Sequence, residues 1–145
     1  SKSSLQDLNG RLRKARGKAV DMDRFRPNVV LSGDLDPYEE DKWTVVRIGT
    51  LTFRCVQGCV RCIVPTIDQR SGERPDGANP TKELEKFRKM EEASFGPYAP
   101  KGPVFGTWAV PSMGGIGQTL RVGDELAVGE IADVSSYDYW SKTMA

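Results

Sequence analysis

Alternating hydrophobic and polar positions in the middle of the chain predict a β-hairpin. Residues 44–48 (TVVRI) and 51–56 (LTFRCV) are rich in β-branched and aromatic side chains, and Gly49 stands between them. Such runs favour paired strands, and glycine supplies the backbone freedom of the turn. The same criteria predict further strands at 104–110, 119–122 and 125–128.

Leucines spaced three and four residues apart predict a helix at the start of the chain. Its apolar face consists of Leu5, Leu8 and Leu12. Ser3 can cap this helix and Gln6 can reach back to it, which is a capping-box spacing. A second helix is expected from Pro80 to about residue 93, because Asn79 is a favourable N-cap and proline is favoured in the first turn.

Many short strands with two small helices predict a mostly β fold, a β-barrel-like closed sheet with two short peripheral helices. The chain has 145 residues, enough for one domain with its own core. We expect that domain over residues 1–129 and a tail over 130–145, where the periodicity fades. The chain begins at Ser1 and not at methionine, which suggests a fragment, a processed form or a trimmed chain. No apolar run of about 18 residues is present, so no membrane span is expected.

The composition limits the classes of function. The net charge is +1 and 28% of the residues are charged, which is ordinary for a globular protein. Basic side chains gather between residues 11 and 26, but no aromatic platform is interleaved with them, so nucleic acid is not expected as a partner. Histidine is absent, which removes the usual catalytic base. The three cysteines are an odd number, which favours a reducing intracellular setting over a disulfide scaffold.

The three cysteines all fall within one short stretch, at positions 55, 59 and 62. We expect a strand to lead in, Gln57 and Gly58 to bend the chain, and residues 63–67 to form the outgoing strand. The fixed charge of Arg61 would favour the thiolate form of either neighbouring cysteine. A thiolate held in this way is typical of a metal ligand or a nucleophile. The alternative is that one or two of the thiols, Cys55 above all, pack as small apolar groups.

The spacing of the cysteines excludes some kinds of site and leaves one open. As a bare pattern it matches the cluster loop of radical S-adenosylmethionine enzymes, but the strands here do not alternate with long helices. A zinc site would lack its fourth strong ligand. A redox switch of the C-x-x-C type stays open, although no thioredoxin-like pattern surrounds it.

The segment RFRPN at residues 24–28 predicts an anion-binding clamp. In an extended chain Arg24 and Arg26 would share one face and Phe25 the other, and Pro27 would hold Arg26 extended. Two guanidinium groups beside the amide of Asn28 suit the phosphate or carboxylate of a polyanionic small molecule. One carboxylate of the acidic turn at 34–41 could pair with either arginine.

These motifs together resemble the C-terminal part of a MOSC domain, over about residues 3–128. They occur in the order RFRPN (24–28), EDKW (40–43), RIG (47–49), CVRC (59–62) with TID (66–68) and SG (71–72), Leu84-Phe87-Arg88, VFG (104–106) and RVGD (121–124). The chain is most similar to the branch of the mitochondrial amidoxime-reducing component and its bacterial relatives. The C-terminal domain of molybdenum-cofactor sulfurase, a group also associated with pyridoxal phosphate binding, shares the first and fourth motifs. Members also have preceding segments that carry further cofactor contacts.

The resemblance implies a molybdenum cofactor, molybdopterin, with Cys62 as the metal ligand and catalytic residue. It implies that Arg26 and Asn28 contact the phosphate-bearing pterin, with Arg24, Val60 and Arg61 as further cofactor-binding positions. Val60 departs from the usual serine and leaves only its backbone for contact.

The implied function is the reduction of small N-hydroxylated substrates, with electrons from a b-type cytochrome and its reductase. The implied location is cytoplasmic or mitochondrial. The alternative is a non-catalytic module that binds the cofactor or carries its sulfur for a sulfurase.

Overall fold

The computed structural model describes residues 1–77, 79–89, 102–115 and 117–131, with the backbone alone for residues 130 and 131. The chain divides into two compact units. Unit 1 contains Ser1–Glu39 and Cys59–Gly106, and unit 2 contains Glu40–Gly58 and Thr107–Ala145.

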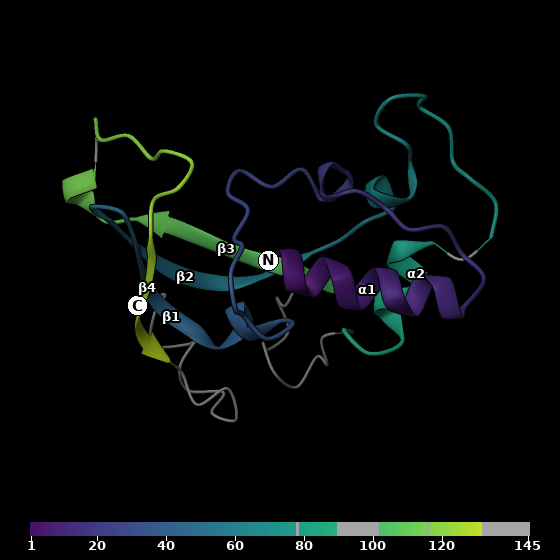
Figure 1. Cartoon of the computed structure of the whole chain (residues 1–145), viewed down its shortest axis with the longest axis horizontal. Helices are drawn as coiled ribbons and strands as arrows, with labels where there is room; N and C mark the ends of the chain where they lie inside the picture. Colours follow the sequence, from purple (N-terminus) through teal and green to yellow (C-terminus); the bar gives the residue numbers. More distant parts are fainter. Residues whose placement is uncertain (78, 90–101, 116, 132–145) are drawn as a thin grey trace. The chain divides into compact units, whose positions relative to one another are not determined.

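The strands form one sheet in the order β3-β2-β1-β4 (Figure 1). Their bounds are Trp43–Ile48 for β1, Leu51–Val60 for β2, Val104–Pro111 for β3 and Leu126–Ile131 for β4. The predicted first hairpin is confirmed, since β1 pairs antiparallel with β2 and Gly49 turns with a φ of 56°. The predicted strand at 119–122 is wrong, because those residues lie outside any strand. Instead β4 pairs antiparallel with the free side of β1.

The core of unit 2 lies on the hairpin. Its buried apolar side chains in the described residues are Trp43, Val46, Leu51 and Cys55. Cys55 is 3% exposed, so the alternative that this cysteine packs as a small apolar group is the one the structure supports.

The core of unit 1 is built around the first helix, α1 (Lys2–Lys14). The predicted leucine stripe is confirmed, because Leu8 and Leu12 are fully buried. They cluster with Val20, Phe25, Leu84 and Phe105. The helix begins two residues earlier than the sequence predicts, since Ser1 and not Ser3 is the N-cap, and its side chain accepts a hydrogen bond from the backbone N–H of Ser4.

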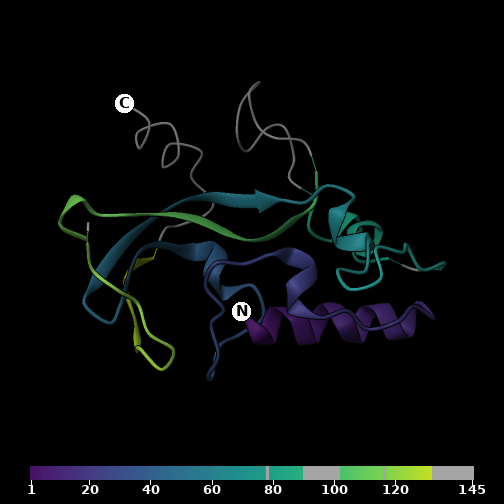
Figure 2. The same cartoon turned by 90° about the horizontal axis from the view of Figure 1, so that it is seen from above.

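The second helix, α2 (Pro80–Glu85), lies against α1 (Figure 1 and Figure 2). The predicted cap is confirmed, because the side chain of Asn79 accepts a hydrogen bond from the N–H of Lys82. The helix is shorter than predicted and ends at Glu85, while residues 90–93 lie outside the described part. Short 3-10 helices connect the other elements: η1 (Met22–Phe25), η2 (Glu39–Lys42), η3 (Val64–Thr66) and η5 (Met113–Gly115).

The predicted fold class is confirmed: the chain is mostly β with few helices. The described strands form an open four-stranded sheet and do not close into a barrel. None of the helices in the described ranges is long and apolar enough to cross a membrane. Residues 132–145 lie outside the described residues, so the domain boundary after residue 129 stays a prediction.

Candidate functional site

The segment that contains Arg24 and Arg26 is helical and not extended, so the prediction of an extended clamp is wrong. Residues Met22–Phe25 form η1, and Arg26 follows in the left-handed conformation with φ 48° and ψ 49°. The reason is the core: Phe25 is 1% exposed and stacks on Phe105 with ring centroids 4.1 Å apart. Anchoring that ring requires the chain to turn tightly around it, which overrides the extended preference of a residue before proline.

Arg24 is held by a carboxylate. One of its terminal nitrogens donates to Asp68 Oδ2 at 2.6 Å. Asp68 Oδ1 accepts from the backbone N–H groups of Arg70 and Ser71 at 2.9 and 3.0 Å. These backbone hydrogen bonds, with the charge of Arg24, lower the pKa of Asp68. The prediction that one carboxylate of the 34–41 turn could pair with Arg24 or Arg26 is therefore wrong for Arg24, whose charge is balanced by Asp68, and no such pair with Arg26 occurs among the described residues.

Arg61 is half-buried and bonded to two backbone carbonyls. Its Nε and Nη2 donate to the carbonyl of Phe105 at 2.8 and 2.6 Å, and Nη1 donates to the carbonyl of Phe25 at 2.8 Å. Burial lowers the pKa of this guanidinium, but arginine stays charged at neutral pH. No carboxylate bonds to Arg61 within the described part of the chain, so its positive charge is not neutralised there.

Arg26 and Asn28 have different surroundings from the other two arginines. Both side chains are exposed, and neither has a hydrogen-bond or ion-pair partner among the described residues. A free guanidinium and a free amide two residues apart, on the segment whose Phe25 carbonyl accepts a hydrogen bond from Arg61, can bind an anion without first breaking internal contacts.

The cysteines differ strongly in access. Cys55 is buried, Cys59 is intermediate and Cys62 is exposed. Burial raises the pKa of Cys59 although Arg61 acts to lower it, so the expected thiolate-favouring effect of Arg61 does not win at this residue. The prediction of a bend at residues 57 and 58 is wrong, because β2 continues through Val60. The predicted outgoing strand is also wrong, since η3 follows.

The backbone around Cys62 is fixed on both sides. The N–H of Arg61 donates to the carbonyl of Pro103 at 2.7 Å, and the hydroxyl of Thr81 donates to the carbonyl of Cys62 at 3.0 Å. Val60 packs so closely against the backbone that a Cβ at Gly102 would lie 2.7 Å from its Cγ1. Cys62 therefore presents an accessible thiol from a chain segment that has little freedom to move.

These contacts bring most of the predicted site residues into one part of unit 1. Arg61 touches the backbone of Phe25, η1 lies against η3, and the ion pair with Asp68 spans the same two segments. The described residues hold no group of three His, Cys, Asp or Glu side chains that could bind a bare metal ion. One accessible thiol with anion-binding groups nearby suits a metal that arrives with most of its own ligands.

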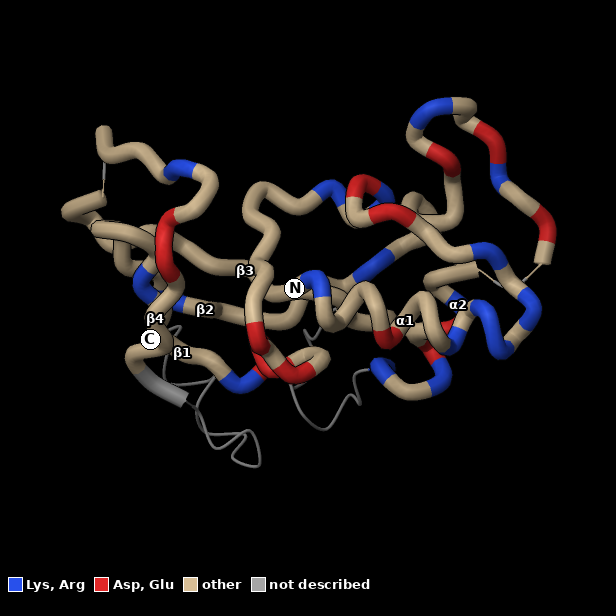
Figure 3. Tube along the Cα trace, in the orientation of Figure 1, with Lys and Arg blue, Asp and Glu red and all other residues tan. Residues whose placement is uncertain are grey.

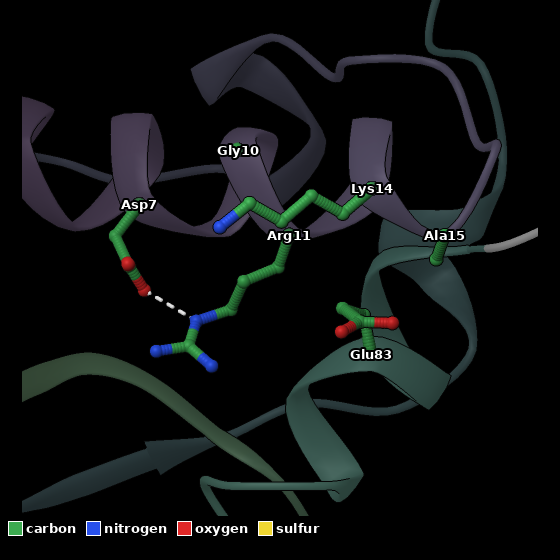
Figure 4. Close-up of a pocket in the computed structure, with 6 residues that line it drawn as sticks. All are labelled: Asp7, Gly10, Arg11, Lys14, Ala15 and Glu83. Carbon is green, nitrogen blue, oxygen red and sulfur yellow. Dashed lines mark hydrogen bonds and ion pairs between the residues drawn. The ribbon is translucent and has the colours of Figure 1, made fainter.

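The surface also has a pocket elsewhere in unit 1, with a volume of about 490 Å³ (Figure 4). It lies between α1 and α2. Its lining residues are Asp7, Gly10, Arg11, Lys14, Ala15 and Glu83. Arg11 bonds there to Asp7 at 2.7 Å and stacks over the ring of Phe87 at 3.8 Å. This pocket contains no cysteine and none of the predicted site residues.

Comparison with known proteins decides the family. A model of the MOSC domain matches residues 1–127. The chain belongs to the MOSC domain family. The predicted family is thus confirmed, and its motifs lie within the matched range.

The relatives of this MOSC domain include the two predicted branches. It is 37% identical over 124 residues to the mitochondrial amidoxime-reducing component 1 of Homo sapiens, covering 86% of this chain and 34% of that protein. It is 39% identical over 96 residues to the molybdenum cofactor sulfurase of Oryza sativa subsp. japonica, covering 63% of this chain and 12% of that protein. The chain spans about one third of the length of the amidoxime-reducing components that it matches.

Two features of the site were missed by sequence reasoning. Asp68 and Phe105 both lie in recognised motifs, but nothing in the sequence indicates that a carboxylate 44 residues away bonds to Arg24 or that a carbonyl 44 residues away accepts from Arg61. The sequence signal near Phe105 was Gly106, because glycine is favoured where the backbone needs a positive φ or a close approach. In the structure Gly106 has a φ of 79°.

Proposed function

We propose that this MOSC domain is the molybdenum-cofactor-binding part of an oxidoreductase that reduces small N-hydroxylated substrates. The observation that carries the proposal is the hydrogen bond from Arg61 to the Phe25 carbonyl, which joins the segment of an accessible thiol, Cys62, to that of a free guanidinium, Arg26. The names of the relatives, amidoxime-reducing component and molybdenum cofactor sulfurase, support the choice of cofactor.

The residues present fit a pterin-bound molybdenum centre. Cys62 supplies a soft thiolate ligand, and Arg26 with Asn28 binds the phosphate of the pterin. Val60 offers only backbone groups to the cofactor. When bound, the molybdenum centre supplies the two-electron redox chemistry that the chain itself lacks.

The side chains of Arg24 and Arg61 support the binding residues and do not themselves bind the cofactor in this proposal. Arg24 is engaged by Asp68 and Arg61 by two carbonyls, so they orient the loops that carry Arg26 and Cys62. The charge of Arg61 also adds to the positive field that attracts an anionic cofactor. In this proposal a b-type cytochrome and its reductase supply the electrons, and the protein works inside the cell, in the cytoplasm or in mitochondria.

The second candidate is a module that binds the cofactor or carries its sulfur without catalysis. The match to a molybdenum cofactor sulfurase supports it, since the identity of 39% is similar to the 37% found for the amidoxime-reducing component. Both candidates use Cys62 and Arg26 for binding and differ only in turnover. The associated pyridoxal phosphate binding stays a prediction.

The experiment combines metal analysis with an activity assay. This chain and its longer parent protein are expressed with molybdate, the bound molybdenum is quantified, and reduction of a benzamidoxime-type substrate is followed with a b-type cytochrome and its reductase. The proposal expects stoichiometric metal and turnover in the parent protein. Metal without turnover selects the binding module, and absence of metal from both proteins contradicts the proposed function.

A further inference from the structure

The hydrogen bonds of Arg61 single out two peptide units. All three guanidinium nitrogens donate, and the two acceptors are the carbonyls of Phe25 and Phe105. Each carbonyl belongs to the peptide that leads into a residue of positive φ: Arg26 at 48° and Gly106 at 79°. The side chain of Arg61 therefore holds the chain at two places where it turns into the left-handed region.

The peptide between Phe25 and Arg26 is fixed from both ends. Its carbonyl accepts from Arg61 Nη1 at 2.8 Å, and its N–H donates to the carbonyl of Asp23 at 2.9 Å. A non-glycine residue in the left-handed region is uncommon and costs conformational free energy. Such a conformation persists where the surroundings determine it, and here they do so through Arg61 and the buried ring of Phe25.

The neighbourhood of Arg61 is shaped for this side chain. Its guanidinium lies 5.7 Å from the ring of Phe25, which stacks on Phe105. A Cβ at Gly106 would lie 3.5 Å from Arg61 Nη2, which is ordinary van der Waals contact, so the positive φ of Gly106 and not lack of space favours glycine there. Lysine could not reproduce the arrangement, because one ammonium cannot bridge two carbonyls with a planar fork.

We propose that Arg61 is a positioning residue, which holds Arg26 in the left-handed conformation that presents its free guanidinium to the anionic cofactor. The identity of the anionic cofactor rests on the proposed function, but the conformation that Arg61 imposes on Arg26 does not. Arg61 acts through Arg26, and its own guanidinium is directed to backbone carbonyls. This role differs from the direct cofactor contact that the resemblance implies for Arg61.

The test uses Arg61→Lys, with Arg54→Lys as the matched control on β2, the strand that ends directly before Arg61, because Arg54 is exposed. In the apo protein, the one-bond Cα–Hα coupling of Arg26 reports the sign of its φ. We expect Arg61→Lys to move this coupling toward negative φ and Arg54→Lys to leave it unchanged. An unchanged coupling in the Arg61 variant would overturn the proposal.

The second readout is a double-mutant cycle on affinity for the molybdenum cofactor in the full-length protein. Arg61→Lys should weaken binding by about tenfold, the scale of losing one oriented charge-assisted contact. In the Arg26→Ala background the same change should add nothing, because the group that Arg61 positions is gone. Additive losses would mean that Arg61 contacts the cofactor directly and would overturn the proposal.

A measurement on the unmutated protein guards against a variant that does not fold. The Nε–H of Arg61, bonded to the Phe105 carbonyl, should exchange with solvent much more slowly than that of exposed Arg54. Equal exchange rates would overturn the proposal. If the wild-type protein bound no cofactor, the proposed function would fail, while the coupling of Arg26 and the exchange of Arg61 would still decide the positioning role.

Discussion

Two regions of unit 1 use arginine in opposite ways. In the pocket between α1 and α2, Arg11 bonds to Asp7, and this hydrogen bond raises the pKa of the arginine. Around Cys62, Arg61 bonds only to neutral carbonyls, and burial lowers its pKa. Blue and red positions lie side by side along α1 and α2 (Figure 3), and there Glu83 also pairs with Lys86 at 2.5 Å.

The difference shows why the pocket between α1 and α2 is not the better candidate for an anion site. The carboxylate bonded to Arg11 offsets the field that would attract an anion, whereas hydrogen bonds to carbonyls fix a guanidinium and leave most of its charge in place. The site around Cys62 therefore has two uncompensated guanidinium groups, Arg26 and Arg61, among the described residues. The two regions therefore differ in charge balance.

The largest expected effect is the loss of metal from Cys62→Ser. Replacing the soft thiolate by a hydroxyl removes the proposed ligand, so the molybdenum–sulfur signal in X-ray absorption from this residue and any reductase activity of the full-length protein should disappear. Because Cys62 is exposed, the fold should stay intact by circular dichroism. Cys59→Ser and Cys55→Ser should keep most of the metal. Molybdenum lost from the Cys59 variant but retained by the Cys62 variant would contradict the assignment.

Arg26→Ala should break the contrast between the two regions. Removing one charge-assisted contact costs on the order of 1.5–3 kcal/mol, so cofactor affinity should fall by about ten- to a hundredfold. Arg11→Ala is the matched control, because it removes an arginine from the neutralised pocket and should leave the dissociation constant unchanged. Titration of both variants with the cofactor measures the two dissociation constants. Equal losses of affinity would show that the two regions do not differ in anion binding.

A smaller effect is expected in thiol alkylation of the apo protein. Cys62 is exposed and Cys55 is buried, and burial also raises the pKa of Cys55. Iodoacetamide should therefore modify Cys62 faster by about tenfold or more, since the buried thiol of Cys55 reacts only when the hairpin opens locally. Peptide mass spectrometry over a time course gives both rates. Faster labelling of Cys55 would show that the hairpin core opens readily.

The smallest effect concerns the ion pair between Arg24 and Asp68. The folded pKa of Asp68 is lowered, so this carboxylate stabilises the fold above its unfolded pKa, and the stabilisation is lost as pH falls through the folded pKa. Asp68→Asn should lower the free energy of unfolding near neutral pH, and the gap from wild type should close on acidification. Urea titrations at several pH values test this, and a gap that widens toward acid would have the wrong sign.

The sequence predicted the elements whose signals are local. The hairpin through Gly49, the leucine stripe of α1 and the cap at Asn79 depend on neighbouring residues, and the structure confirms each. The strand at 119–122 was wrong because its apolar alternation is short and nothing fixed its partner. The sheet pairs β1 with β4 instead, which is a long-range choice.

The site shows the same division between local and distant information. Motif order indicated the family, and Cys62, Arg26 and Asn28 stay as predicted binding residues. The prediction that residues 24–26 are extended was wrong, because the burial of Phe25 against Phe105 outweighs the extended preference of the residue before proline. The roles of Arg24 and Arg61 depend on partners that only the fold brings near. The sequence therefore identified these residues as candidates but did not predict their hydrogen-bond partners.

The two carbonyls that Arg61 joins have a consequence for the order of folding. They lie 36 and 44 residues from Arg61 along the chain, on opposite sides of it. Closing two such loops costs chain entropy before the bonds form, and contacts between distant segments slow folding. We therefore expect α1 and the first hairpin to form early and the Arg61 bridge late. In a refolding experiment, the appearance of cofactor affinity would then mark the completion of the chain's topology.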